Sequence, residues 1–388
     1  MKKNISFISP ISSRSGYGDC SREIALAMLQ LFKKENIELL STRWGNCPLS
    51  ELDYNTETNN YLKSKLVSTP NKNCDVSCQV SLPSEFYRFG KRSYGITAGL
   101  EFLGWPDDFI LKCNEMDSII VHSEFTKQAL LDSEHNNVKC ETPVNVVFQS
   151  YDEIYSSEIK ENTKNSRMEN LLSNIQEEFC FLAVGVFTEN NDRKNIVNLI
   201  ETFQKTFANT KHQVALVLKI NGPRYNTQNL CKLRDFIKSL NMKFENPQST
   251  YLLYGDFQNT DLKIMYTHPK IKSLVTLTHG EGFGRPLLEA SVCGLPIIAS
   301  NWSGHIDFLD SEMAHLVQGK LEYVGDIIPY STNKSVWFSP DYSHASSLLV
   351  NLVENYKECK TNAIELGKIN AKKYNKKEMY NVYESIIQ

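Results

Sequence analysis

The 388-residue sequence lacks several patterns that would assign a protein to a function class at once. Its ten cysteines include no Cys-x-x-Cys pair, which argues against a zinc site and favours reduced thiols in a reducing compartment. No apolar run approaches the roughly 20 residues that span a bilayer, so any membrane contact would be peripheral. The first ten residues are too polar for a signal peptide and are better explained as a strand. We therefore expect a soluble cytoplasmic protein, in the host cytoplasm if the chain is viral.

A strong charge of either sign is also absent, because the formal net charge is -3. This balance gives no general attraction to nucleic acid or anionic membranes, although a local basic groove could lie within it. The length indicates two domains, and the alternation of short apolar strands with helices favours an α/β fold with parallel sheets. We place the domains at 1–150 and 179–375, joined by a charged, polar linker at 151–178.

The most informative stretch is His279–Ala290, which reads His-Gly-Glu-Gly-Phe-Gly-Arg-Pro-Leu-Leu-Glu-Ala. The residues before it, Ser273–Thr278, are apolar and β-branched enough for a buried strand, and Leu287–Cys293 is expected to be helical. Pro286 suits the first helical position, where no backbone donor is needed. A glycine turn that joins a strand to a helix start leaves N–H groups and the positive end of the helix dipole facing a ligand. Such a place favours phosphate.

Two carboxylates belong to this stretch. Glu281 lies in the glycine turn, and Glu289 lies in the expected helix, about one helical turn beyond Pro286. A carboxylate accepts two hydroxyl hydrogens at once, as a ribose or hexose diol offers, so the pair suggests one acid for each sugar of a nucleotide diphosphate sugar. For either acid alone, an ordinary glutamate in a first helical turn is the plain alternative.

Glu281 and Glu289 are separated by Gly-Phe-Gly-Arg-Pro-Leu-Leu and followed by the run 290–300. This string resembles the signature of the retaining glycosyltransferases of family four, in group 1. The likeness extends to Tyr254-Gly255-Asp256 upstream and to 304–309 downstream.

The resemblance implies the GT-B fold, two Rossmann-like domains with parallel sheets that face each other across a cleft. The first domain would bind the acceptor and the second the donor, and a last helix at about 376–388 would pack back on the first domain. Glu289 would hold the donor ribose, and Glu281 the transferred sugar. The donor-binding residues that we assign are Gly16, Gly18, Arg193, Lys194, Gly282, Phe283, Gly284, Arg285 and Glu289.

Gly16 and Gly18 stand at an expected helix start, as Gly-x-Gly-x-x-Ser, a weak dinucleotide fingerprint without its last glycine. A plain turn explains them equally well, but similar enzymes usually carry here a glycine-rich turn that faces the donor phosphates. Arg193 and Lys194 precede another helix, in the stretch Phe187–Asn195, and can neutralise a diphosphate. Similar enzymes place a lysine there and an arginine just after the preceding glycine. Because Val186 occupies that second place, the role of Arg193 stays open.

No Asp-x-Asp pair occurs, so we predict a metal-independent enzyme without a cofactor. Similar enzymes let the acceptor attack on the face of the leaving diphosphate, and stabilising charge is then the main task. We assign catalytic roles to Glu281, Lys194 and Glu101, where Glu101 is the first-domain side chain expected to face the donor sugar. His122 is a second candidate for that place, although a histidine that ends a buried strand is more often a core residue. His279 and His305 are expected to line the donor pocket.

The sequence thus favours a retaining hexosyl- or pentosyltransferase that moves a sugar from a nucleotide diphosphate donor to a hydroxyl acceptor. A glycan or surface polysaccharide intermediate is the expected acceptor, and a hydroxymethylated base of phage DNA is the alternative. Two alternatives from other functional classes remain: an NAD-dependent oxidoreductase and a non-catalytic sugar-nucleotide-binding module.

Overall fold

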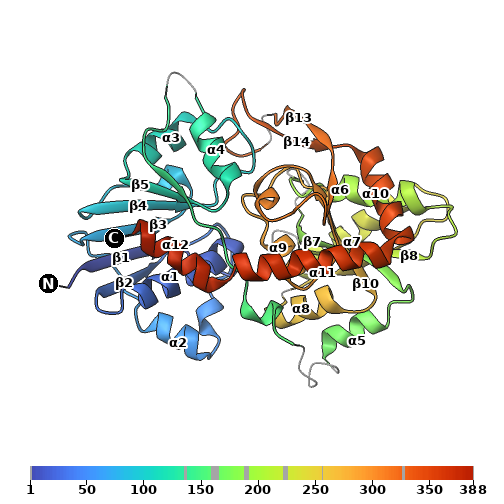
Figure 1. Cartoon of the computed structure of the whole chain (residues 1–388), viewed down its shortest axis with the longest axis horizontal. Coiled ribbons are helices and arrows are strands. Elements are labelled where there is room, and N and C mark those ends of the chain that lie inside the picture. The colour runs from blue at the N-terminus through green and yellow to red at the C-terminus, as the bar shows by residue number, and fades with distance from the viewer. Residues whose placement is uncertain are drawn as a thin grey trace. The chain divides into compact units, whose positions relative to one another are not determined.

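The computed structural model describes residues 2–134, 138–158, 166–187, 192–221, 226–255, 257–325 and 328–387. Its contacts divide the chain into two compact units. The first contains Met1–Ser150, Tyr330–Ser335 and Lys376–Gln388, and the second contains Tyr151–Pro329 and Val336–Asn375. Each unit is built on its own six-stranded parallel sheet (Figure 1).

The sheet of the first unit has the strand order β2-β1-β3-β4-β5-β6. Every neighbouring pair is parallel, and β1 lies between β2 and β3. The order therefore reverses at β1, since the chain moves outward to β2 and then back across to β3. The elements are β1 (Asn4–Ser9), α1 (Gly16–Leu31), β2 (Asn36–Ser41), η1 (Glu51–Asp53), α2 (Glu57–Lys63), β3 (Val76–Val80), η2 (Pro83–Glu85), β4 (Arg92–Thr97), α3 (Asp107–Asn114), β5 (Ser118–Val121), α4 (Glu124–Asp132), β6 (Val144–Val146) and α12 (Lys376–Ile386).

The last helix of the chain belongs to the core of the first unit. Met379 and Tyr383 of α12 are buried in the same apolar cluster as Ile24 and Met28 of α1. Figure 1 shows α12, in red, beside α1 and the blue strands. The hydrophobic effect therefore holds the two ends of the chain in one core, because these side chains bury their apolar surface against each other.

The sheet of the second unit has the order β12-β11-β10-β7-β8-β9, and all its pairs are parallel. The chain runs from β7 outward to β9 and then starts again at β10 on the other side. The elements are η3 (Glu153–Tyr155), α5 (Arg167–Ser173), β7 (Phe179–Val186), α6 (Ile196–Phe207), β8 (Val214–Asn221), α7 (Thr227–Asn241), β9 (Ser249–Leu253), α8 (Asn259–Thr267), β10 (Ile271–Thr276), α9 (Arg285–Val292), β11 (Ile297–Ser300), η5 (Gly304–Asp307), β12 (His315–Val317), α10 (Tyr342–Glu354) and α11 (Tyr356–Lys373), with an antiparallel hairpin of β13 (Gly319–Tyr323) and β14 (Val336–Pro340).

The core of the second unit follows from the apolar content of its strands and helices. Strand β8 reads Val-Ala-Leu-Val-Leu-Lys-Ile-Asn, a near-continuous apolar run of the kind expected where both faces of a parallel sheet are covered. Helices α6, α7 and α10 contribute Phe203, Ile237 and Leu349 to one buried cluster with this strand. Other contacts join α9 to α11 and α5 to α8.

The expected α/β class with parallel sheets is confirmed, and several boundaries differ. The sequence predicts the first helix over 21–32, but the helix begins at Gly16, because Ser15 caps it by accepting a hydrogen bond from the Gly18 N–H at 3.1 Å. The stretch 151–178, which the sequence predicts as a charged, polar linker, contributes η3 and α5 to the second unit. Within the described ranges, no helix is long and apolar enough to cross a bilayer.

Candidate functional site

The glycine turn joins β10 to α9 in the second unit. Gly284 is the residue before the helix and has φ +97°, a conformation that favours glycine, and Pro286 lies in the first turn as expected. A neighbouring loop clamps the turn from the side. The Glu281 N–H donates to Ser303 Oγ at 2.9 Å, and the Gly304 N–H donates to the Glu281 carbonyl at 2.9 Å. A Cβ on Gly304 would lie 2.3 Å from the Gly282 carbonyl oxygen, so the two backbones are in direct contact.

The turn places Glu281 between two cations. Its carboxylate accepts a hydrogen bond from Lys194 Nζ at 2.6 Å and lies 3.5 Å from Arg193 Nη1. Glu281 is only 7% exposed, and this burial by itself raises its pKa. The charges of Lys194 and Arg193 outweigh burial and hold the pKa at about 2, below the usual 4.5. Glu281 is therefore ionised at neutral pH, inside a nearly buried cluster.

The strand order explains why these three residues meet. Strand β10 pairs with β7, so the loops that leave their carboxyl ends are neighbours, and they flank the point where the strand order reverses. Ligands of open α/β sheets bind at such a point. Lys194 also packs against Gly185 near the end of β7, where a Cβ would lie 3.3 Å from Lys194 Cγ. Of the stretch Phe187–Asn195, residues 188–191 lie outside the described residues.

Asn195 fixes the direction of the two cations. It has φ +57°, a left-handed conformation that asparagine tolerates, and it ends the turn before α6. Its buried side chain donates to the Leu277 carbonyl at 2.8 Å, and the His279 N–H donates to the Arg193 carbonyl at 2.9 Å. These bonds tie the loop after β7 to the loop after β10. Sequence reasoning did not single out Asn195, because asparagine before a helix is common.

Burial disfavours the charged form of both histidines near the turn. Burial lowers the pKa of His305, and its Nε2–H donates to the Ser300 carbonyl at 2.6 Å. Its Nδ1 has no hydrogen-bond partner among the described residues. Burial also lowers the pKa of His279, which donates from Nδ1 to the Phe338 carbonyl and stacks on Trp337 with ring centroids 4.1 Å apart. His305 contributes its charge to the surroundings of Glu281 only if it is protonated, and its lowered pKa disfavours that.

The second carboxylate, Glu289, lies on α9 and is 6% exposed. Arg285, one turn earlier on the same helix, has its Nε 3.6 Å from Glu289 Oε1. Two buried phenols stand near it. Burial, and then the charge of Glu289, raises the pKa of both Tyr155 and Tyr266. Lys219 at the end of β8 is within electrostatic reach of Glu289 as well. Sequence reasoning did not place Tyr155, Tyr266 and Lys219 near Glu289, because they come from distant parts of the sequence.

The remaining residue of the motif has a packing role. Phe283 is 3% exposed, and its ring lies against Phe308 and Tyr374, with centroids 5.2 and 6.3 Å away. The ring thus anchors the turn to α11. Only the backbone of Gly282, Phe283 and Gly284 is then left to line a ligand. Downstream of the β9 strand, Tyr254 and Gly255 are described, whereas Asp256 lies outside the described residues.

The first unit carries the other assigned residues, Gly16, Gly18 and Glu101. The Gly18 N–H is occupied by the Ser15 side chain, and a Cβ at Gly18 would lie 2.0 Å from the Ser13 carbonyl oxygen. Gly18 therefore allows α1 to pack closely on its own loop. A Cβ at Gly16 would meet nothing within 4 Å. Glu101 follows β4 and lies close enough to act electrostatically on Tyr17.

His122, the second candidate in this unit, is a core residue. It is 2% exposed, with Nδ1 2.9 Å from the Val147 carbonyl and Nε2 3.2 Å from the Cys20 sulfur. Both ring nitrogens thus have partners inside the unit. Among the described residues, no three His, Cys, Asp or Glu side chains lie where they could hold a metal ion together.

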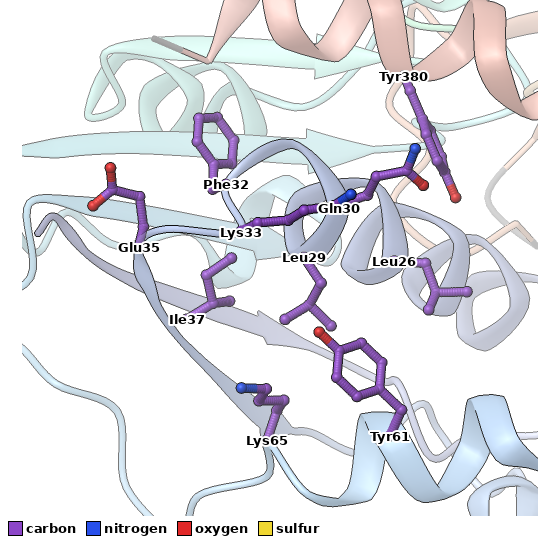
Figure 2. A pocket seen from close by; sticks show the side chains of 10 residues that line it. All are labelled: Leu26, Leu29, Gln30, Phe32, Lys33, Glu35, Ile37, Tyr61, Lys65 and Tyr380. Atoms are coloured by element: carbon purple, nitrogen blue, oxygen red, sulfur yellow. The ribbon is translucent and has the colours of Figure 1, made fainter.

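A cavity of about 570 Å³ lies elsewhere in the first unit. Figure 2 shows it between α1, the end of α2, β2 and α12, with Leu29, Ile37, Tyr61 and Tyr380 among its lining residues (Figure 2). Its lining includes none of the assigned site residues. The assigned cations, the two carboxylates and the start of α9 lie at the glycine turn instead.

Comparison with known proteins matches part of the second unit to a described protein family. Residues 170–317 match the family model described as glycosyl transferases group 1. This match lies within the second unit. No relative was found among functionally curated proteins.

Solved structures show the fold of the whole chain. A glycosyltransferase from Rickettsia africae aligns over 99% of this chain and 97% of its own, with 12% identity and a TM-score of 0.66. Anabaena HepE in complex with UDP and glucose aligns over 99% and 98%, with 12% identity and a TM-score of 0.64. An α,α-trehalose 6-phosphate synthase from Burkholderia multivorans covers 99% and 98%, with 11% identity and a TM-score of 0.63. The chain therefore has the expected GT-B fold.

Proposed function

We propose that this group 1 family member is a retaining glycosyltransferase that transfers a hexose from a nucleotide diphosphate sugar to a hydroxyl acceptor. The observation that carries the proposal is the cluster of Glu281, Lys194 and Arg193 at the glycine turn, where the strand order reverses. The structure of HepE contains UDP and glucose, and the trehalose 6-phosphate synthase of Burkholderia xenovorans is described as UDP-forming. Both support a uridine diphosphate hexose as the donor to test first.

The reaction requires charge stabilisation more than a nucleophile. The bond between the anomeric carbon and the diphosphate oxygen breaks, and the acceptor oxygen bonds to that carbon on the same face. The acceptor proton leaves with the diphosphate. Negative charge grows on the diphosphate during this step, and Lys194 with Arg193 would stabilise it, assisted by the N-terminus of α9.

Each carboxylate has a separate task in this proposal. Glu281 accepts hydroxyl hydrogens of the transferred sugar while it shares Lys194 with the diphosphate, and Glu289 accepts the two ribose hydroxyls. Because Glu281 stays ionised down to a pH of about 2, it is always an acceptor in the physiological range. We assign no step to a metal or cofactor, and cations of the chain serve the diphosphate.

A panel of nucleotide diphosphate sugars tests the proposal. Release of the nucleoside diphosphate is followed with each donor, first without an acceptor, because slow hydrolysis reports donor binding and activation alone. Lys194→Ala and Glu289→Ala should each reduce this hydrolysis at least about a hundredfold, since a charge-assisted contact in a buried site is lost. Lys205→Ala, on the exposed face of α6, is the matched control.

The outcomes separate the competing functions. No release with any donor, while a sugar nucleotide still binds, would indicate a non-catalytic module and refute the enzyme. Equal hydrolysis by wild type and both site variants would remove the site assignment. The NAD-dependent oxidoreductase loses its support, because the family match covers the glycine turn and the Gly18 N–H is already used by Ser15.

A further inference from the structure

Two stacked aromatic rings lie at the carboxyl edge of the first sheet. Tyr17 is in the first turn of α1, just after β1, and Trp44 is in the loop that follows β2. Their ring centroids are 3.7 Å apart with an interplanar angle of 19°. Both side chains are partly exposed. We call this pair the aromatic shelf. It lies where the strand order of the first sheet reverses, the place at which open parallel sheets bind ligands.

The shelf is held rigidly. The Tyr17 hydroxyl accepts a hydrogen bond from the Ala98 N–H at 3.1 Å and lies 3.3 Å from Thr97 Oγ1, at the end of β4. Burial of that hydroxyl raises the pKa of Tyr17 far above its usual range, so it stays neutral. The loop that holds Trp44 is joined to the loop after β1, because the Arg14 N–H donates to the Pro48 carbonyl at 2.9 Å. A surface that is fixed in advance loses little entropy when a ligand binds.

Space and polar groups surround the shelf. A Cβ on Gly16 or Gly45, the neighbours of Tyr17 and Trp44 in sequence, would meet no atom within 4 Å. The indole N–H of Trp44 has no hydrogen-bond partner in the described part of the chain. Glu101 acts electrostatically on Tyr17 and lies partly exposed. The shelf thus combines an aromatic face with a hydrogen-bond donor and a carboxylate acceptor at its edges.

This combination fits a carbohydrate. One face of a pyranose presents C–H groups, which suit the negative face of an aromatic ring, and its rim presents hydroxyls, which suit a carboxylate and an N–H. A nucleic acid would also stack, but its phosphates require an excess of cations. The charged side chains of these loops and of the first turns of α1 balance each other: Arg14, Arg22 and Arg43 against Asp19, Glu51 and Glu101.

We propose that the aromatic shelf is a carbohydrate-binding subsite, with Trp44 as the stacking residue and Glu101 as the hydroxyl acceptor, and that the acceptor substrate is therefore a glycan. The identification of the bound glycan as the acceptor substrate rests on the proposed function. The binding of a sugar to the aromatic shelf does not depend on that function.

Saturation-transfer NMR on the full chain tests the subsite directly. The probes are methyl α-D-glucopyranoside, methyl α-D-galactopyranoside, methyl α-D-mannopyranoside and a ten-nucleotide single-stranded oligodeoxynucleotide. We expect transfer to at least one glycoside with wild type, and its dissociation constant should rise about tenfold or more in Trp44→Ala. Trp44→Phe keeps a stacking ring and should restore most of the affinity. Tyr61→Ala, in the cavity of Figure 2, is a matched aromatic control and should bind as wild type does.

Donor hydrolysis without acceptor separates this inference from the proposed function. Trp44→Ala should hydrolyse the donor within about twofold of wild type, because Trp44 belongs to the first unit and the glycine-turn cluster to the second. No glycoside binding by wild type, equal binding by Trp44→Ala, loss confined to Tyr61→Ala, or binding of the oligonucleotide alone would each overturn the carbohydrate subsite. Glycoside binding with no donor hydrolysis would leave the subsite standing and remove the glycosyltransferase.

Discussion

Replacement of Lys194 by methionine isolates the charge cluster at the glycine turn. The change removes the ammonium group that lies 2.6 Å from Glu281 and keeps most of the aliphatic side chain that packs on Gly185. Glu281, which is 7% exposed in the wild-type protein, then has Arg193 at 3.5 Å as its remaining close cation. Burial, which favours the neutral acid, is no longer outweighed, so the pKa of Glu281 should rise.

The magnitude follows from the pKa of Glu281. The gap between 4.5 in the unfolded chain and about 2 in the folded chain corresponds to about 3 kcal/mol of stability at pH 7. A depressed carboxyl pKa stabilises the fold above pH 4.5, and this stabilisation is lost as the pH falls through about 2. Lys194→Met should therefore lower the free energy of unfolding by about 3 kcal/mol at pH 7, in the range for breaking a buried ion pair.

Urea unfolding of the full chain at pH 7 and pH 4 measures the effect. The difference between wild type and Lys194→Met should shrink by roughly half at pH 4, because the variant's buried carboxyl is then protonated. The double variant Lys194→Met/Glu281→Gln should be more stable than Lys194→Met alone at pH 7, since it removes the uncompensated charge. Two results together would show that Lys194 does not hold Glu281 ionised. The double variant would be no more stable than Lys194→Met, and the stability difference between wild type and Lys194→Met would be the same at pH 7 and pH 4.

Three further predictions test the surroundings of the cluster. Gly304→Ala puts a Cβ 2.3 Å from the backbone oxygen of Gly282 and should cost about 1–3 kcal/mol in thermal or urea unfolding and most donor hydrolysis, whereas Gly16→Ala, with open space around it, should stay within about 0.5 kcal/mol of wild type. Because burial lowers the pKa of His305, its neutral form stabilises the fold at high pH, and stability should fall as the pH drops below 6.5; His305→Gln should flatten that slope in a pH series of melting temperatures. Donor hydrolysis should be unchanged by a chelator, and activity that returns only with manganese or magnesium would contradict metal independence.

The sequence predicted the centre of the second unit well, because local rules and the motif agree there. Glycine and proline fix the turn before α9, and apolar runs mark β7 and β8. The reach of Lys194 to Glu281 follows once β7 and β10 are neighbours, but spacing along the chain does not reveal that pairing.

Other elements could not be predicted, because distant residues satisfy their polar groups. Strand β3 reads Val-Ser-Cys-Gln-Val and is buried throughout, and its Ser77 and Gln79 donate to the carbonyls of Phe89 and Tyr87 in a later loop. The local sequence around β3 does not predict these hydrogen-bond partners. Likewise, Tyr155 lies within electrostatic range of Glu289, although it comes from the stretch predicted as a polar linker. Burial of polar side chains depends on the assembled fold, and a single sequence does not display it.

The position of α12 affects how the protein matures on the ribosome. Domains generally fold in the order in which they emerge. Here, however, Met379 and Tyr383 of α12 complete the apolar cluster around Ile24, so the core of the first unit closes only after α12 has been synthesised. All residues that the structure describes in the second unit precede α12 in the sequence, so they are synthesised before this helix. Nascent chains should therefore carry a complete second unit and an incomplete first unit until α12 emerges, and the first unit is where chaperones would find exposed apolar surface.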